Sequence, residues 1–136
     1  MKKTKLRILQ MLVMDSFPDG SLGRICLADQ EVFFKNKKGW TIHDVSKSVS
    51  KGWTDRYAFK DNGGSILAVA HCDTVFGGKH PYSVDIKDLK VFSPELDDRL
   101  GVYIISNLLP RLGVKCDVLL TENEEMCSST ATSFKT

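Results

Sequence analysis

The chain has 136 residues, of which 42% are hydrophobic and 26% are charged. This balance is typical of one globular domain with an ordinary core, and it excludes a disordered or fibrous protein. The formal net charge of +2 is small for a chain of this length. Charge alone therefore predicts no nucleic acid and no membrane surface as a partner.

The first predicted element is an amphipathic helix near the start of the chain. Leu6, Leu9 and Val13 recur at helical spacing, as expected for one apolar helix face. The basic head resembles that of a signal peptide, but Gln10 interrupts the apolar stretch and no small-residue cleavage site follows,. No run approaches the length of about 20 apolar residues that spans a bilayer.

The cysteines indicate a reducing compartment. They have neither the paired spacing of a zinc ribbon nor the density of a disulfide scaffold. We therefore predict a soluble protein in the cytoplasm. The four cysteines are Cys26, Cys72, Cys116 and Cys127.

Short strands are predicted through the first half of the chain. The segments 24–28 ("RICLA") and 31–35 ("EVFFK") have apolar patterns typical of strands,. The segment 56–60 ("RYAFK") leads through "DNGG" into 65–70 ("SILAVA"), which predicts a hairpin with a glycine turn. The last of these segments is apolar on both faces, so we expect a central strand that is covered on each side.

The second half predicts a hairpin and then a crossover unit. The segments 82–86 and 89–92 form the hairpin around Lys87 and Asp88. A helix is predicted over 98–112, ended by Gly113, and 115–121 ("KCDVLLT") reads as a buried strand. The order strand, helix, strand predicts a parallel pair in an α/β sheet.

Polar side chains cluster at the ends of these elements. Ligands of open α/β sheets bind beyond the carboxyl ends of the strands, so clusters there should converge. Residues two apart in an extended chain point to the same side, which lets the first cluster share one site. The three clusters are His71 with Asp73, Asp97 with Asp98, and Glu122 with Glu124 and Glu125.

One imidazole with several carboxylates suits zinc, or manganese or cobalt where oxygen ligands dominate. A nearby carboxylate that is not a ligand would act as general base, and the chemistry would be hydrolysis. Each cluster also has a structural explanation. His71 would be a hydrogen-bonded surface residue, the Asp97 and Asp98 pair would cap the helix, and Glu124 with Glu125 would be a solvated pair.

The motifs at these positions resemble those of the dinuclear zinc exopeptidase clan, which includes aminopeptidases, tripeptidases and carboxypeptidase-like amidohydrolases. "AVAHCDTV" resembles the clan's strand ending in His-x-Asp, "SPELDDRLGV" its Asp-Asp-Arg segment, and "LLTENEEM" its strand ending in Thr-x-x-Glu-Glu. The resemblance covers roughly residues 60–130. It implies a three-layer α/β/α fold with a mixed, largely parallel central sheet, in which residues 1–136 form a single domain.

The resemblance also implies a role for each matching residue. His71, Asp97 and Glu125 would be metal ligands, with Asp97 bridging two zinc ions and the Asp97–Asp98 peptide commonly cis. Asp73 would accept a hydrogen bond from the His71 ring and orient it. Glu124 would be the general base, taking a proton from water that attacks a metal-polarised amide carbonyl and passing it to the leaving amine. The substrate would be a peptide or a small amide.

The segment after Glu125 departs from the clan's pattern. It contains no Asp, Glu or His, whereas the clan takes a further carboxylate and a distal histidine from later positions. Filling those positions with His43 or His80 would break the clan's order. We therefore expect the amino-terminal part of a metallopeptidase catalytic domain, incomplete at its C-terminus, with a second chain or another copy completing the site.

Two other interpretations stay open. The first is a non-catalytic or degenerate peptidase-like protein that acts as a metal-binding or interaction module. The second is a basic nucleic-acid binder, which rests only on the lysine clusters at 2–5 and 35–38. Failure to bind DNA or RNA at low salt would remove it.

Overall fold

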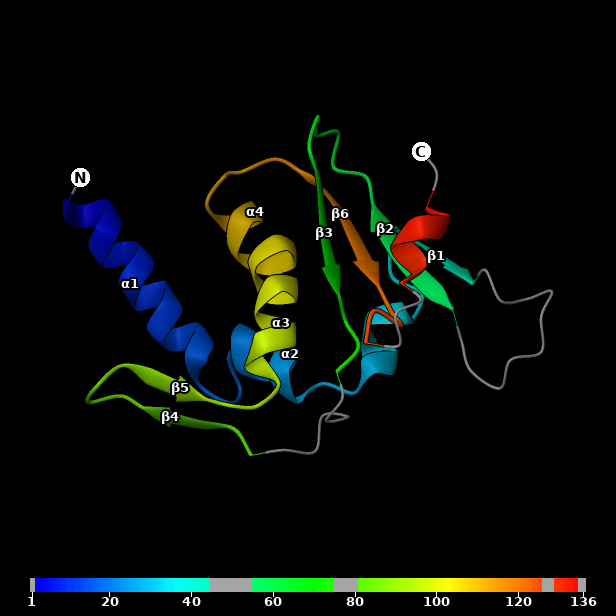
Figure 1. Ribbon diagram of the computed structural model, residues 1–136. Coiled ribbons are helices and arrows are strands. Elements are labelled where there is room, and N and C mark those ends of the chain that lie inside the picture. Colours follow the sequence, from blue (N-terminus) through cyan, green and yellow to red (C-terminus); the bar gives the residue numbers. More distant parts are fainter. Residues whose placement is uncertain (1, 45–54, 75–80, 126–128, 135–136) are drawn as a thin grey trace.

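The computed structural model describes residues 2–44, 55–74, 81–125 and 129–134. A four-stranded mixed sheet in the order β1-β2-β6-β3 lies at its centre (Figure 1). A separate antiparallel hairpin pairs β4 with β5. The strands are β1 (Trp40–Asp44), β2 (Arg56–Lys60), β3 (Leu67–His71), β4 (Ser83–Asp85), β5 (Lys90–Phe92) and β6 (Asp117–Thr121).

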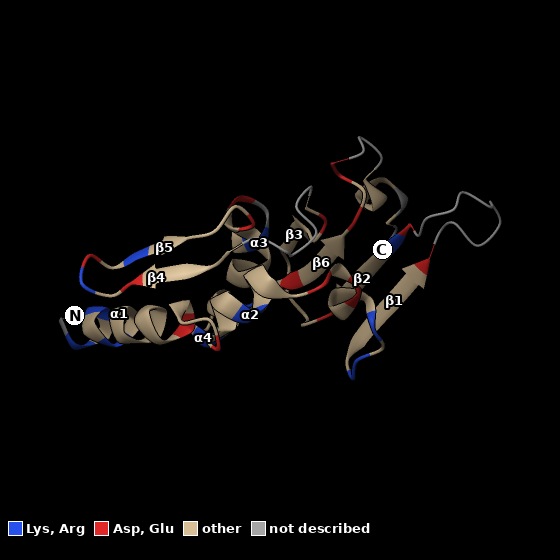
Figure 2. Cartoon of the chain, turned by 90° about the horizontal axis from the view of Figure 1, so that it is seen from below, with Lys and Arg blue, Asp and Glu red and all other residues tan. Residues whose placement is uncertain are grey.

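The helices lie toward the β3 side of the sheet, and α1 lies beside the β4–β5 hairpin at the end farthest from β1 (Figures 1 and 2). None of the described helices combines the length and the apolar character needed to cross a lipid bilayer. The helices are α1 (Lys2–Ser16), α2 (Ser21–Leu27), α3 (Leu96–Tyr103) and α4 (Leu109–Arg111), with 3-10 segments η1 (Gln30–Phe34) and η3 (Thr130–Ser133) and the π segment η2 (Ile104–Leu108).

The crossover unit predicted from the sequence is confirmed. β3 and β6 pair in parallel, and α3, η2 and α4 form the continuous helical stretch between them. This stretch ends at Gly113, whose φ of 79° is in the left-handed region. The Gly113 and Val114 amides donate to the carbonyls of Pro110 and Leu109 at 3.1 and 3.0 Å, which is the arrangement that commonly closes a helix.

The predicted strands at 24–28 and 31–35 are wrong, because these segments lie in α2 and η1. Leu22, Cys26 and the partly buried Ile25 face the core at helical spacing, a pattern that a five-residue window does not separate from a strand. Phe33 and Phe34 are adjacent and both buried, whereas neighbours in a strand face opposite sides.

The predicted strand order also needs correction. The segments 56–60 and 65–70 do not form a hairpin, because β6 lies between β2 and β3. Among the described residues the sheet has three pairings, of which only β3 with β6 is parallel, so this part of the sheet is not largely parallel. The central strand is β6, whose residues Val118–Leu120 are buried. β3 is an edge strand among the described residues, and its Leu67 and Val69 are 39% and 49% exposed.

One face of the sheet packs on the helices and contains most of the core. Ala58, Val118 and Leu120 of this face belong to the same buried cluster as Val102 and Ile105 of the crossover helix. On the opposite face, Phe134 packs its ring against Tyr57 and Phe59 at centroid distances of 5.4 and 4.9 Å. This arrangement leaves the carboxyl ends of β3 and β6 side by side at one rim of the sheet.

Candidate metal site

The parallel pairing of β3 and β6 brings two of the predicted clusters together. His71 and Thr121 are register partners at the ends of their strands, and the Cys72 amide extends the ladder by donating to the Thr121 carbonyl at 2.7 Å. The loop that follows β6 therefore starts directly beside His71. This is the carboxyl-end position where open α/β sheets bind ligands.

His71 and Asp73 share one side of the chain, as their spacing predicts. The Nδ1 atom of His71 lies 3.1 Å from the Asp73 carbonyl oxygen and 3.2 Å from Oδ1 of Asp73. Both neighbours are acceptors, so Nδ1 carries the ring proton and donates it. The lone pair is then on Nε2, which makes Nε2 the atom that would bind a cation.

Cys72 lies between these two residues but points to the opposite side. Its side chain is fully buried in the core beneath the helices. Burial raises the pKa of its thiol well above the usual range. Cys72 is therefore a neutral core residue and not a metal ligand, because the thiolate is the form that binds metal.

Asp73 also fixes the loop after β6. Its Oδ1 atom accepts a hydrogen bond from the Glu124 amide at 3.3 Å, and Oδ2 accepts one from the Glu125 amide at 2.9 Å. Asp73 is only 7% exposed. One buried carboxylate thus holds the His71 ring and the backbone of two acidic residues from a remote part of the sequence.

Asp73→Asn should lower zinc affinity by about 10- to 100-fold, the usual cost of losing a carboxylate that orients a ligating histidine. An amide oxygen and nitrogen cannot accept from both loop amides and from the ring. Calorimetric titration with zinc measures this change. Asp61→Asn is a matched control, because Asp61 is an exposed carboxylate that caps the Gly63 amide at the far end of β3. Equal affinities in the two variants would contradict the orienting role of Asp73.

A His-Glu-Glu group results from these contacts. His71, Glu124 and Glu125 each offer one ligand atom, and the three atoms lie within 4.8 Å of one another. The Nε2 atom of His71 is 3.7 Å from Oε2 of Glu124. A tetrahedral site with ligand distances of about 2.1 Å separates its ligand atoms by about 3.4 Å, so the group fits a small cation after modest side-chain rotation.

Asp97 lies outside this group. It is exposed in the first turn of α3, where a carboxylate also favours the positive end of the helix dipole,. The Asp97–Asp98 peptide is trans, because no cis peptide bond occurs among the described residues. The expected cis bond is therefore wrong for this structure, and a bridging role for Asp97 stays a prediction.

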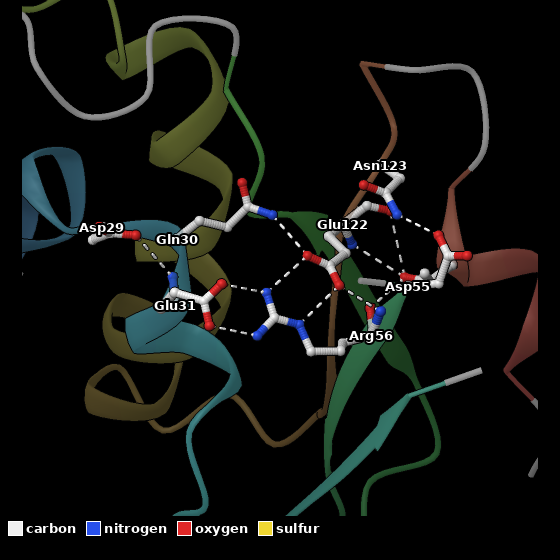
Figure 3. A network of polar contacts seen from close by, with 8 residues as sticks. Asp29, Gln30, Glu31, Asp55, Arg56, Glu122 and Asn123 are labelled. Carbon is white, nitrogen blue, oxygen red and sulfur yellow. Dashed lines mark hydrogen bonds and ion pairs between the residues drawn. The ribbon is translucent and has the colours of Figure 1, made fainter. Parts of the chain in front are cut away.

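The third predicted cluster divides into two parts. Glu122 is 1% exposed and points into a polar network with Arg56 and Gln30 (Figure 3). Its Oε2 accepts hydrogen bonds from the Arg56 backbone amide at 2.5 Å and from Nε of Arg56 at 2.9 Å, and its Oε1 accepts from Gln30 at 2.8 Å. Glu122 is thus an anchor for the loop rather than a ligand.

Arg56 connects this anchor to η1. Its guanidinium also binds Glu31 through two hydrogen bonds of 2.7 and 2.9 Å. Hydrogen bonding to Glu122 raises the pKa of Arg56, and hydrogen bonding to Arg56 lowers the pKa of Glu31. Nothing in the sequence pattern identified Arg56, because a single arginine at a strand start has no distinctive spacing.

Asn123 has a left-handed backbone conformation and separates Glu122 from the two exposed glutamates. Asn123 has a φ of 66°, in the left-handed region that asparagine tolerates better than most residues. Its side-chain amide donates to Asp55. The Glu122 amide in turn donates to Oγ1 of Thr130 at 3.1 Å. These contacts direct Glu124 and Glu125 toward Asp73 and His71.

His43, which could have supplied another ligand, lies elsewhere. It is on β1, at the opposite edge of the sheet, with its ring 5.2 Å from that of Tyr57. His80, the other histidine considered, falls outside the described residues.

Comparison of the chain with protein-family models, with curated proteins and with solved structures found no match. The chain is a mixed α/β protein with a His-Glu-Glu group at the carboxyl end of its parallel strand pair.

Proposed function

We propose that the protein is a metal-dependent hydrolase of peptide or amide bonds, of the zinc exopeptidase type. The observation that carries this proposal is the convergence of His71, Glu124 and Glu125 within 4.8 Å, on a framework that Asp73 fixes through the ring and the loop amides. Exposed acidic groups are common without an ion. A buried carboxylate that orients a histidine beside them is a more specific feature.

Each residue has a distinct role in this proposal. His71, through Nε2, and Glu125 hold the cation. Glu124 is the general base, because its side chain is 52% exposed and its Oε2 lies 3.7 Å from Nε2 of His71. A bound divalent cation supplies Lewis acidity, which polarises a carbonyl and lowers the pKa of water. Glu124 takes the proton from the attacking water and delivers it to the leaving amine.

The order and spacing of the three motifs support a relationship to the dinuclear zinc exopeptidase clan. In that relationship Asp97 would move to bridge a second ion, and a second chain or another copy would complete the ligand set. The three-layer fold stays a prediction as well, since it requires a layer over the sheet face where Leu67 and Val69 are exposed. Zinc is the proposed metal, with manganese or cobalt as alternatives.

A second candidate is a non-catalytic protein that binds one metal weakly. The position of Asp97 outside the group favours it, because three ligands with two exposed carboxylates make a weaker site than a dinuclear one. Calorimetry separates the two candidates. Two tight zinc sites and turnover support the hydrolase, and one weak site without turnover supports the second candidate.

His71→Ala tests the site directly. We expect zinc affinity to fall at least 100-fold, because the only imidazole in the group is lost. His43→Ala is the matched control, since it removes an exposed histidine from the opposite edge of the same sheet. Zinc affinity that falls equally in both variants, or in neither, would refute the site.

A further inference from the structure

A cavity of about 300 Å³ lies between the helical stretch and the sheet, at the rim where β6 begins (Figure 1). This rim is opposite to the His71 group, because His71 and Thr121 lie at the carboxyl ends of β3 and β6. The volume is at the small end of the range for ligand pockets, so the cavity suits a small molecule. Its lining includes Trp40, Lys60, Ser106, Pro110, Lys115 and Val118.

The floor of the cavity is a row of three side chains across the sheet. Trp40 is the register partner of Lys60, and Lys60 is that of Val118. Register partners of antiparallel strands lie on the same face of a sheet. Val118 belongs to the buried cluster under the crossover helix, so the row lies on the face that the helices cover. The floor is therefore apolar, with one positive charge in its middle.

Three lysines gather at this cavity without an acidic partner. The Nζ atoms of Lys37 and Lys60 lie 4.6 and 5.8 Å from the centroid of the Trp40 ring, and Lys115 lines the cavity beside β6. None of the three forms an ion pair with an acidic residue in the described part of the chain. The pKa of Lys37 is lowered by partial burial and also by the charge of Lys60. The lysines therefore repel one another.

The carboxylates of the adjoining loop already bind backbone amides. Oδ1 of Asp117 accepts from the Asn62 and Gly64 amides at 2.8 and 3.1 Å, and Oδ1 of Asp61 accepts from the Gly63 amide at 2.8 Å. These two carboxylates fix the loop between β2 and β3. Three lysines against two carboxylates leave a surplus of positive charge at the cavity, which attracts an anion.

We propose that this cavity binds a small phosphate monoester with an apolar body, the phosphate between Lys60 and Lys115 and the body against Trp40 and Val118. Lysine binds phosphate as a point charge. A phosphate monoester carries a charge of about −1.5 to −2 at neutral pH, so it neutralises a group of lysines better than a carboxylate does. The site is separate from the His71 group and does not depend on the proposed hydrolase.

Titration of the metal-free protein with phenyl phosphate at about pH 8, where the phosphate is a dianion, tests the proposal. Amide chemical shifts report the location of binding. The Lys60, Lys115 and Val118 amides should shift, and the His71 amide should not. Inorganic phosphate and phenol each supply half of the ligand, so each should bind about tenfold more weakly. Phenyl sulfate has a similar shape and a single negative charge, and it should bind several-fold more weakly.

Lys60→Gln and Lys115→Gln should each weaken binding of phenyl phosphate about tenfold, because a charge-assisted hydrogen bond is lost. Lys90→Gln is the matched control, since Lys90 is an exposed lysine of β5 that does not line the cavity, and it should have little effect. Trp40→Leu should weaken binding of phenyl phosphate and not of inorganic phosphate. If Trp40→Leu fails to fold, the ligand series still decides the question, because it leaves the protein unchanged.

The binding of the His71→Ala variant separates this proposal from the proposed hydrolase. The variant should bind phenyl phosphate as the unmodified protein does, whether or not the protein binds zinc. Several results would overturn the proposal. Shifts confined to the His71 group would move the anion to the candidate metal site, and equal losses in the Lys60, Lys115 and Lys90 variants would show unspecific attraction. Equal affinity for phenol would remove the role of charge, and equal affinity for phenyl sulfate would exclude selection of phosphate.

Discussion

Glu124→Gln should reduce zinc-dependent peptide hydrolysis by about 10²- to 10⁴-fold, the range that a positioned general base contributes. The amide keeps the size of the side chain and cannot take a proton from water. Zinc content should persist, because His71 and Glu125 hold the ion in our assignment. The measurement is kcat on short peptides, together with metal content after dialysis.

Glu125→Gln is the matched control for this prediction. It lies next in the loop, has the same side-chain length and is also exposed, but it should lose zinc along with activity. If Glu124→Gln loses the metal instead, the roles of ligand and base are exchanged between the two glutamates. Full hydrolysis by Glu124→Gln would remove Glu124 from the mechanism.

Glu122→Gln should lower the free energy of unfolding by about 3 kcal/mol, because it removes the buried partner of Arg56 and leaves only the ion pair with the exposed Glu31,. Glu122 is 1% exposed and accepts hydrogen bonds from both Arg56 and Gln30. The same substitution should loosen the loop that carries Glu124. Urea unfolding measures the stability change.

Glu31→Gln provides the comparison, since Glu31 binds the same guanidinium from the solvent side. Its side chain is 61% exposed, and exposed ion pairs contribute only about 0–1 kcal/mol. Arg56 keeps its buried ion pair with Glu122 in this variant. Similar losses of stability in the two variants would show that burial of Glu122 is not what makes the anchor strong.

The parts of the fold that the sequence predicted are the long or strongly patterned ones. The helix ending at Gly113 and the buried strand before Thr121 each have a clear period and a clear end. The parallel pairing of β3 with β6 follows from the helix between them. The meeting of His71 with the loop after β6 was therefore predictable.

Short segments and strand order were not predictable in the same way. The segments around Cys26 and Phe33 are five to seven residues long, too short for the apolar pattern to separate a helix from a strand. The insertion of β6 between β2 and β3 depends on non-local pairing. The strand β1 was missed for the same reason, because its pairing with β2 determines it.

The candidate site was predictable in its residue types and not in its support. The spacing of His71 and Asp73 indicated a shared side, but the hydrogen bonds from Asp73 to the two loop amides depend on the folded loop. Glu122 and Glu124 look equivalent in the sequence. The left-handed turn at Asn123 separates them into an anchor and a site residue.

Zinc-edge anomalous diffraction from crystals of the zinc-soaked protein tests the central claim most directly. We expect an ion about 2.1 Å from Nε2 of His71 and from a carboxylate oxygen of Glu125, with Glu124 beside it and Nδ1 of His71 still hydrogen-bonded to Asp73. Zinc bound only at other residues, or an empty His71 group at saturating zinc, would contradict it.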